Sequence, residues 1–201
     1  AHPELEMIYG FECDWYPGCE ENVQRWSSGA QVLLGSVHWL GEQEDGAWID
    51  DTSDVTIWRE LGPDEVWRRY VEAWCRACES PLPFGTMAHP DLPERMRNEG
   101  FAATIDLAPL WDQMVACAHD TGRRVELSTA GRRKGGGDYY PSRGLLERFC
   151  KAGVPITVGS DAHAPADMCD GIREAYAHAW GVGYRSVEVP RADGTWESMP
   201  L

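Results

Sequence analysis

Four apolar stretches of this chain each end directly before an acidic residue or a histidine. The stretches cover residues 7–11, 32–37, 84–88 and 156–160. The residues that follow them are Glu12, His38, His89 and Asp161. Short apolar runs beside glycine or proline are typical of buried strands. If the strands are parallel, their carboxyl ends lie together, so we expect an α/β fold with these four side chains on one face.

Amphipathic helices are expected between and after these strands. The predicted helices cover residues 62–78, 106–121, 141–152 and 166–180. The first begins with Pro63 and two acidic residues, and the second ends before Gly122, which suits a helix C-cap. Alternation of strands and helices indicates βα units around a parallel sheet or barrel, and 201 residues suit one domain covering 1–201. We expect residues 41–53 to form an acidic surface loop and the polar tail, 186–201, to fray.

Composition excludes several classes of partner. The chain has 33 acidic and 18 basic residues, giving a formal charge of −15, which disfavours long nucleic acids. No apolar run approaches the roughly 20 residues of a membrane span, and the first residues lack the features of a secretory signal. We therefore expect a soluble cytoplasmic protein. Seven cysteines at irregular spacing indicate reduced thiols, and Cys75 and Cys78 are interpreted as buried thiols in a helix.

Five side chains form the predicted metal site. They are Glu12, His38, His89, Asp161 and His163. Carboxylate oxygens and imidazole nitrogens are ligands for zinc and similar divalent cations, and Glu12 could bridge two of them. We predict two or three divalent ions (Zn, Mn or Fe), with Glu12, Asp161 and His163 as the catalytic residues. Asp14 and Asp91 fit equally well as ligands or as supporting residues.

A basic, glycine-rich segment follows the strand around residues 125–127. It contains Arg132, Arg133 and Lys134, followed by three glycines. Arginine binds phosphate oxygens in a bidentate manner, and glycines allow backbone N–H groups to approach an anion. We predict that these three cations bind substrate. A solvated basic turn is the alternative, and the segment is not a Walker loop because no Gly-Lys-Ser/Thr follows.

Several sequence blocks, taken in order, resemble one family. Residues 10–18 (GFECDWYPG) are similar to its Gly-x-Glu-x-Asp-Tyr-x-Pro-Gly block, and 35–39 (GSVHW) to its Ser-Val-His-aromatic block. Residues 88–93 (AHPDLP) resemble its His-Pro-Asp block, and 159–163 (GSDAH) match its closing block. Residues 126–131 (ELSTAG) and 140–142 (YPS) resemble its substrate-facing segment. Over nearly its whole length the chain resembles the PHP (polymerase and histidinol phosphatase) metal-dependent phosphoesterases, and among them the PHP-type histidinol-phosphate phosphatases.

The resemblance implies a distorted (β/α)7 TIM-like barrel with a multinuclear metal site that hydrolyses L-histidinol phosphate in histidine biosynthesis. It implies that the five residues above bind metal and that Arg133, beside Arg132 and Lys134, contacts phosphate. The family opens with a His-x-His strand, which this chain does not contain before Glu12. We therefore expect an N-terminally incomplete PHP domain that lacks its first strands. The glycine triplet also replaces a proline-containing loop of the family.

Two alternatives stay open on the sequence. One is a PHP-family phosphoesterase acting on another small phosphate ester or an oligonucleotide. The other is a degenerate barrel that binds one metal ion, or none, and has no catalytic role. The sequence does not decide the oligomeric state.

Overall fold

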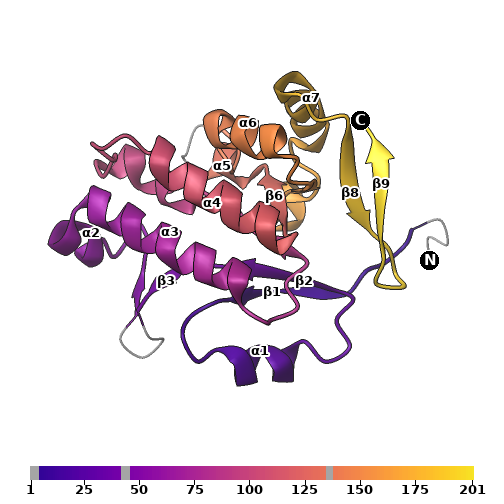
Figure 1. Cartoon of the computed structure of the whole chain (residues 1–201), viewed down its shortest axis with the longest axis horizontal. Helices are drawn as coiled ribbons and strands as arrows, with labels where there is room; N and C mark the ends of the chain where they lie inside the picture. The colour runs from indigo at the N-terminus through magenta and orange to yellow at the C-terminus, as the bar shows by residue number, and fades with distance from the viewer. Residues whose placement is uncertain (1–4, 42–45, 135–137) are drawn as a thin grey trace.

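A five-stranded parallel sheet forms the centre of the computed structural model, which describes residues 5–41, 46–134 and 138–201 (Figure 1). The strands are β1 (Gly10–Asp14), β2 (Val32–Ser36), β5 (Thr86–Met87), β6 (Arg124–Ser128) and β7 (Ile156–Gly159). They lie in the order β1-β2-β5-β6-β7, so each new strand is added at the same edge. Their carboxyl ends therefore lie along one side of the sheet, as the sequence pattern predicts.

Helices occupy the connections between the strands. They are α1 (Glu20–Trp26), α2 (Thr56–Leu61), α3 (Pro63–Glu79), α4 (Ala108–Thr121), α5 (Ala130–Arg133), α6 (Arg143–Ala152) and α7 (Ile172–Val182), with two 3-10 helices, η1 (Leu92–Glu99) and η2 (Pro165–Asp167). In Figure 1, α3, α4 and α6 lie side by side over the sheet. The sheet face that carries Leu33, Val125 and Leu127 is buried against these helices, whereas the opposite face carries the metal-site residue Glu12.

Helix α3 supplies much of the core because its apolar residues recur at helical spacing. Trp67, Tyr70 and Trp74 are each almost completely buried, and burial of each ring contributes about 2–3 kcal/mol. Pro63 is at the start of the helix, where its missing N–H costs no hydrogen bond. The helices predicted at 62–78, 106–121 and 141–152 are confirmed within two residues at each end.

Several predicted boundaries are wrong. Strand β1 begins at Gly10 rather than at Met7, so Glu12 lies inside the strand and not after it. Helix α7 begins at Ile172, because η2 and a turn occupy the residues before it. The tail forms an antiparallel hairpin of β8 (Ser186–Pro190) and β9 (Trp196–Pro200).

The segment predicted as an acidic surface loop is also more structured than expected. Strand β4 (Ala47–Trp48) of this segment pairs antiparallel with β3 (Trp39–Leu40), which precedes it, and Asp50 is buried in an ion pair with Arg95 at 2.8 Å. Burial of this carboxylate is possible because Arg95 neutralises it. The acidic residues at 42, 44 and 45 and the glycine triplet, 135–137, lie outside the described residues.

No closed barrel is present within the described residues, because β1 and β7 are the two edges of the sheet and do not pair with each other. The α/β class and the parallel sheet are confirmed. None of the helices in the described parts of the chain is both long enough and apolar enough to cross a membrane. Each of the seven cysteines is free, and Cys75 and Cys78 lie in α3 as expected.

Candidate metal centre

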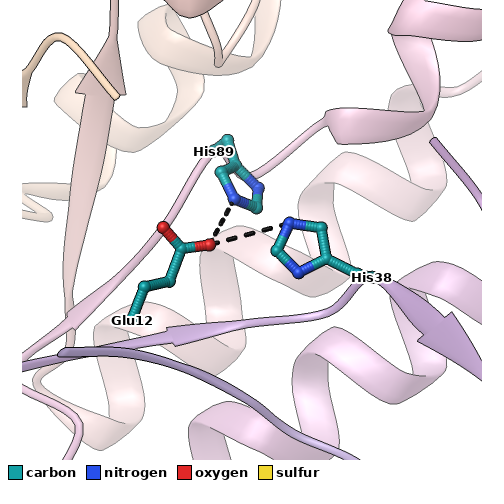
Figure 2. A group of neighbouring side chains, drawn as sticks. All are labelled: Glu12, His38 and His89. Atoms are coloured by element: carbon teal, nitrogen blue, oxygen red, sulfur yellow. Dashed lines mark hydrogen bonds and ion pairs between the residues drawn. The ribbon is translucent and has the colours of Figure 1, made fainter. Parts of the chain in front are cut away.

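Three predicted ligands meet at the carboxyl side of the sheet (Figure 2). Glu12 extends from β1, His38 follows β2 by two residues, and His89 follows β5 by two residues. One carboxylate oxygen of Glu12 lies 2.9 Å from Nε2 of His89 and 3.6 Å from Nε2 of His38. One donor atom from each residue lies within 4.8 Å of the other two. The sheet order explains this meeting, since β1, β2 and β5 are neighbours.

Asp14, the last residue of β1, orients His38. Its Oδ1 contacts Nδ1 of His38 and accepts a hydrogen bond of 3.2 Å from the Ser36 hydroxyl. A carboxylate on Nδ1 places the proton there and leaves the Nε2 lone pair free for a metal ion. This arrangement is typical of histidines that bind metal. In the structure Asp14 therefore supports a ligand and is not itself in the three-residue group.

His89 is held by a second acidic residue, Glu126 of β6. Both side chains are buried, and the Glu126 carboxylate accepts a hydrogen bond of 3.1 Å from the His89 backbone N–H. Gly159 of β7 makes room for this contact, since a Cβ there would overlap the Glu126 carboxylate. Burial, only partly offset by the charge of His89, raises the pKa of Glu126 to about 7.

Glu12 and His89 form an ion pair. Burial alone would raise the pKa of Glu12, but the charge and the hydrogen bond of His89 outweigh it and lower this pKa to about 2. Burial alone would lower the pKa of His89, but Glu12 raises it to about 9. A cation bound between the two would take the place of the His89 proton as the partner of Glu12.

Asp161 and His163, from the segment after β7, line the same cleft without joining the three-residue group. The Asp161 side chain is bound by Lys134, with 2.6 Å between Nζ and Oδ2. His163 is 72% exposed, and its Nδ1 lies 3.0 Å from the backbone oxygen of Asp161. The cleft has a volume of about 680 Å³ and contains all five predicted ligands.

Two of the three predicted phosphate-binding cations line the cleft, and both are already paired. Arg133 donates to the backbone oxygens of Ser160 and Asp161 and lies 3.5 Å from the Asp170 carboxylate. Lys134 binds Asp161, as described above. Arg132 does not line the cleft and instead lies over the ring of Tyr139, 5.7 Å from its centroid. A phosphate role for Arg132 has no support from this geometry.

Several cleft or neighbouring residues escaped the sequence prediction, and four of them hold the site together. They are Trp48, Asp50, Arg95 and Glu126. Asp50 and Trp48 were missed because the many acidic residues of their segment are typical of a solvated loop. Glu126 lies in the apolar strand β6. An acidic residue inside such a strand indicates a specific contact, because burial of a carboxylate requires a partner, and this pattern could have identified Glu126. Asp91, which follows His89, is buried away from the cleft, and burial raises its pKa to about 7.

The donor set fits a divalent metal ion such as zinc. Two imidazole nitrogens and a carboxylate oxygen are typical zinc ligands, and the three donor atoms lie within 4.8 Å of one another. The open cleft beside them leaves space for further ligands. The described residues thus contain a candidate site for a divalent metal ion.

Comparison with known proteins shows what the chain as a whole is similar to. No family model matches the chain. It is 28% identical over 191 residues to a Deinococcus radiodurans protein named "Probable histidinol-phosphatase", an alignment that covers 91% of this chain and 67% of that protein. It is 32% identical over 115 residues to a Thermotoga maritima protein of the same name, with 57% of this chain and 47% of that protein covered.

A solved structure has the same fold. The histidinol phosphate phosphatase of Lactococcus lactis, in complex with zinc, L-histidinol and phosphate, superposes with a TM-score of 0.71. The match has 15% sequence identity and covers 94% of this chain and 71% of that structure. The chain spans about two thirds of the first curated relative and about half of the second. The resemblance inferred from the motifs is therefore confirmed, since the chain is similar in sequence to two proteins named as probable histidinol-phosphatases and in fold to a solved histidinol phosphate phosphatase.

Proposed function

We propose that this chain is the larger part of a metal-dependent phosphatase that hydrolyses L-histidinol phosphate to L-histidinol and phosphate. The observation that carries the proposal is the meeting of Glu12, His38 and His89 beside a cleft that also contains Arg133 and Lys134. A metal centre next to two cationic side chains is suited to binding a negatively charged phosphate ester. Both relatives described above are named as probable histidinol-phosphatases, and we take the proposed substrate from that name.

Each residue has a defined task in this proposal. Glu12, His38 and His89 hold a divalent cation, and Asp161 and His163 complete the ligand set for a second or third ion of Zn, Mn or Fe. A bound cation supplies Lewis acidity, which neutralises phosphoryl charge and activates water. Asp14 keeps the Nε2 lone pair of His38 directed into the centre. Lys134 must release Asp161 for metal binding, and its ammonium group is then free to contact phosphate.

The proposal includes a small-molecule substrate and a single domain over residues 1–201. A cleft of about 680 Å³ is within the usual size range for small ligands. We further propose that the open sheet is part of a distorted (β/α)7 TIM-like barrel, closed by strands outside those of the present sheet. The fold shared with the Lactococcus structure supports an α/β arrangement of this kind.

The experiment is to reconstitute the protein with Zn²⁺ or Mn²⁺ and to measure phosphate release from L-histidinol phosphate. His38→Ala and His89→Ala should each reduce metal content and abolish turnover. His119→Ala is the matched control, because His119 is an exposed histidine of α4 that contacts Asp120 and lies outside the cleft. Full turnover in the His89→Ala protein would refute the proposed centre.

One observation favours a second candidate, a barrel that binds one metal ion without catalysis. Asp161 is paired with Lys134 and His163 is exposed, so only three of the five predicted ligands converge in the described structure. Metal analysis of the purified protein separates the two candidates. Two or more ions per chain with turnover of histidinol phosphate support the phosphatase; one ion per chain without turnover of this or any other phosphate ester supports the binding protein.

A further inference from the structure

A side pocket opens from the metal cleft next to His38. It has a volume of about 250 Å³ and is lined by Trp48, Asp50, Asp51 and Arg95, three of which also line the metal cleft. The Trp48 ring centroid lies 6.1 Å from that of His38. Arg133 and Lys134 also line the metal cleft but do not line the side pocket. A molecule with its phosphate at the metal centre could therefore extend its other end into this pocket.

The indole ring of Trp48 is fixed although much of it is exposed. Its Nε1–H donates to Oδ1 of the buried Asp50, whose Oδ2 binds Arg95 at 2.8 Å. On the other side, the Trp39 ring packs against it with centroids 4.8 Å apart. The residue nevertheless remains 45% exposed. A rigid, exposed aromatic face of this kind is suited to stacking on a flat ring.

The charge of the pocket defines which ring it fits. Asp50 and Arg95 neutralise each other, so Asp51 leaves the pocket with a net negative charge. One Asp51 oxygen, Oδ1, accepts from the backbone and hydroxyl of Ser53. The carboxylate still carries its charge, which attracts an N–H donor or a cationic nitrogen. An aromatic face beside a carboxylate favours a flat, nitrogen-bearing or cationic group.

We infer that Trp48 and Asp51 form the pocket that selects the alcohol portion of the phosphate ester, and that they select a ring bearing nitrogen. Asp50 and Arg95 are positioning residues that hold the Trp48 ring. This inference rests on the proposed phosphatase function and adds residues that determine its specificity. An imidazole-bearing alcohol such as L-histidinol has the required chemistry, whereas an aliphatic alcohol without a ring lacks it.

Two substrates test the inference on the Zn²⁺- or Mn²⁺-loaded protein. The ratio of kcat/KM for L-histidinol phosphate to kcat/KM for glycerol 2-phosphate should fall about tenfold or more in Trp48→Ala, as expected for loss of a stacking contact. Trp48→Phe should retain most of the ratio because it retains a ring. Trp26→Ala is the matched control, since Trp26 is an exposed tryptophan of α1 outside both cavities. An unchanged ratio in Trp48→Ala would overturn the inference.

A binding measurement separates this inference from the proposed function. L-Histidinol alone, titrated calorimetrically into the metal-loaded protein, should bind more weakly to Trp48→Ala and to Asp51→Asn than to the unaltered protein. Absence of turnover with every ester would refute the proposed phosphatase, while weakened histidinol binding would still support the pocket. Equal losses for both esters in Trp48→Ala would show that Trp48 only supports His38, and would overturn a role in selection.

Discussion

His89 and Asp161 have backbone conformations that residues other than glycine rarely adopt. Their φ angles are 25° and 47°, in the left-handed region, where a non-glycine residue costs on the order of 1–3 kcal/mol. Such strain persists only where surrounding contacts hold it in place. For His89 the contact is the Glu126 carboxylate on its backbone N–H, and for Asp161 it is Arg133 on its backbone oxygen. Both proposed ligands are thus fixed through their main chains.

Replacement of Glu126 tests this support. Glu126→Gln retains an oxygen that accepts from the His89 N–H, so metal affinity should stay close to that of the unaltered protein. Glu126→Leu has similar size but no acceptor, and we expect it to weaken Zn²⁺ binding about 10–100-fold, as is usual for residues that orient ligands. Calorimetric titration with Zn²⁺ measures both, and the spectrum of the Co²⁺-loaded protein reports ligand geometry. Equal affinities for the Gln and Leu variants would contradict the role.

The sequence identifies candidate ligands by residue type because divalent cations prefer carboxylate and imidazole donors, but it does not predict their contacts. Glu12, His38 and His89 stand near predicted strand ends, and the sheet order brings them together. The pairing of Asp161 with Lys134 depends on how the loops after β6 and β7 pack. No residue spacing encodes that packing, so the sequence could not distinguish a converged ligand from a paired one.

Among the connecting elements, the segment between α3 and β5 depends on one arginine. Residues 80–84 (SPLPF) contain two prolines, which cannot donate backbone hydrogen bonds. Arg123 donates to the backbone oxygens of Cys78, Ser80, Leu82 and Phe84. One guanidinium group therefore provides hydrogen bonds to the backbone oxygens at the end of α3 and just before β5, the strand that leads to His89.

Arg123→Met should consequently be costly. It retains the aliphatic stem but leaves several carbonyls without a charged donor, and each such hydrogen bond contributes about 1.5–3 kcal/mol. Because water will replace some of them, we expect a loss of about 2–4 kcal/mol in the free energy of unfolding, measured by urea denaturation. Arg148→Met is the control, since Arg148 pairs with the exposed Asp112 and should cost less than about 1 kcal/mol. Similar losses in the two variants would contradict the assignment.

The helix η1 contains a half-buried acid, Glu94, whose charge opposes folding. Burial raises the pKa of Glu94, and the charge of Arg97 offsets this only in part. The folded state therefore binds a proton more tightly than the unfolded state, so stability falls as the pH rises from the unfolded pKa through the folded pKa. Glu94→Gln should remove this loss and be more favourable at pH 7.5 than at pH 4.5.

Urea denaturation at the two pH values measures the effect. Glu99→Gln, an exposed position of the same helix, is the control and should change stability alike at both. A Glu94→Gln effect that is the same at both pH values would show that the folded state does not retain the Glu94 proton.

For the whole molecule, local patterns predict the four longest helices and the parallel sheet, but they miss the shorter helices α1, α2 and α5 and the C-terminal hairpin. Helical periodicity in α3, α4 and α6 is strong because one face of each is buried. The β8–β9 hairpin has weak alternation, and its stability comes from distant contacts. Arg124 of β6 lies 4.3 Å from the centroid of the Trp196 ring, and Glu6 pairs with Arg191 at 3.1 Å. Such long-range contacts are not visible in a local window of sequence.

The metal centre joins parts of the chain that are far apart in sequence. Glu12, His38 and His89 come from or follow three neighbouring strands, and Asp161 follows β7. A cation that binds only the folded state stabilises it by mass action, by about 2.7 kcal/mol when free metal exceeds its Kd a hundredfold. For a domain of this size the Tm should rise by about 5–10 °C.

Thermal unfolding with Zn²⁺, and again after its removal by a chelator, measures this rise. In a protein carrying both Glu12→Gln and His89→Ala the rise should disappear, because two of the three converging donors are lost. Exposed histidines and free cysteines elsewhere also bind zinc, and they remain in that variant. If the variant shows the full rise, zinc acts through those sites and the strand-end centre does not bind it. If the rise is lost while the metal-free Tm values stay similar, the cation stabilises the fold by joining neighbouring strands at their carboxyl ends.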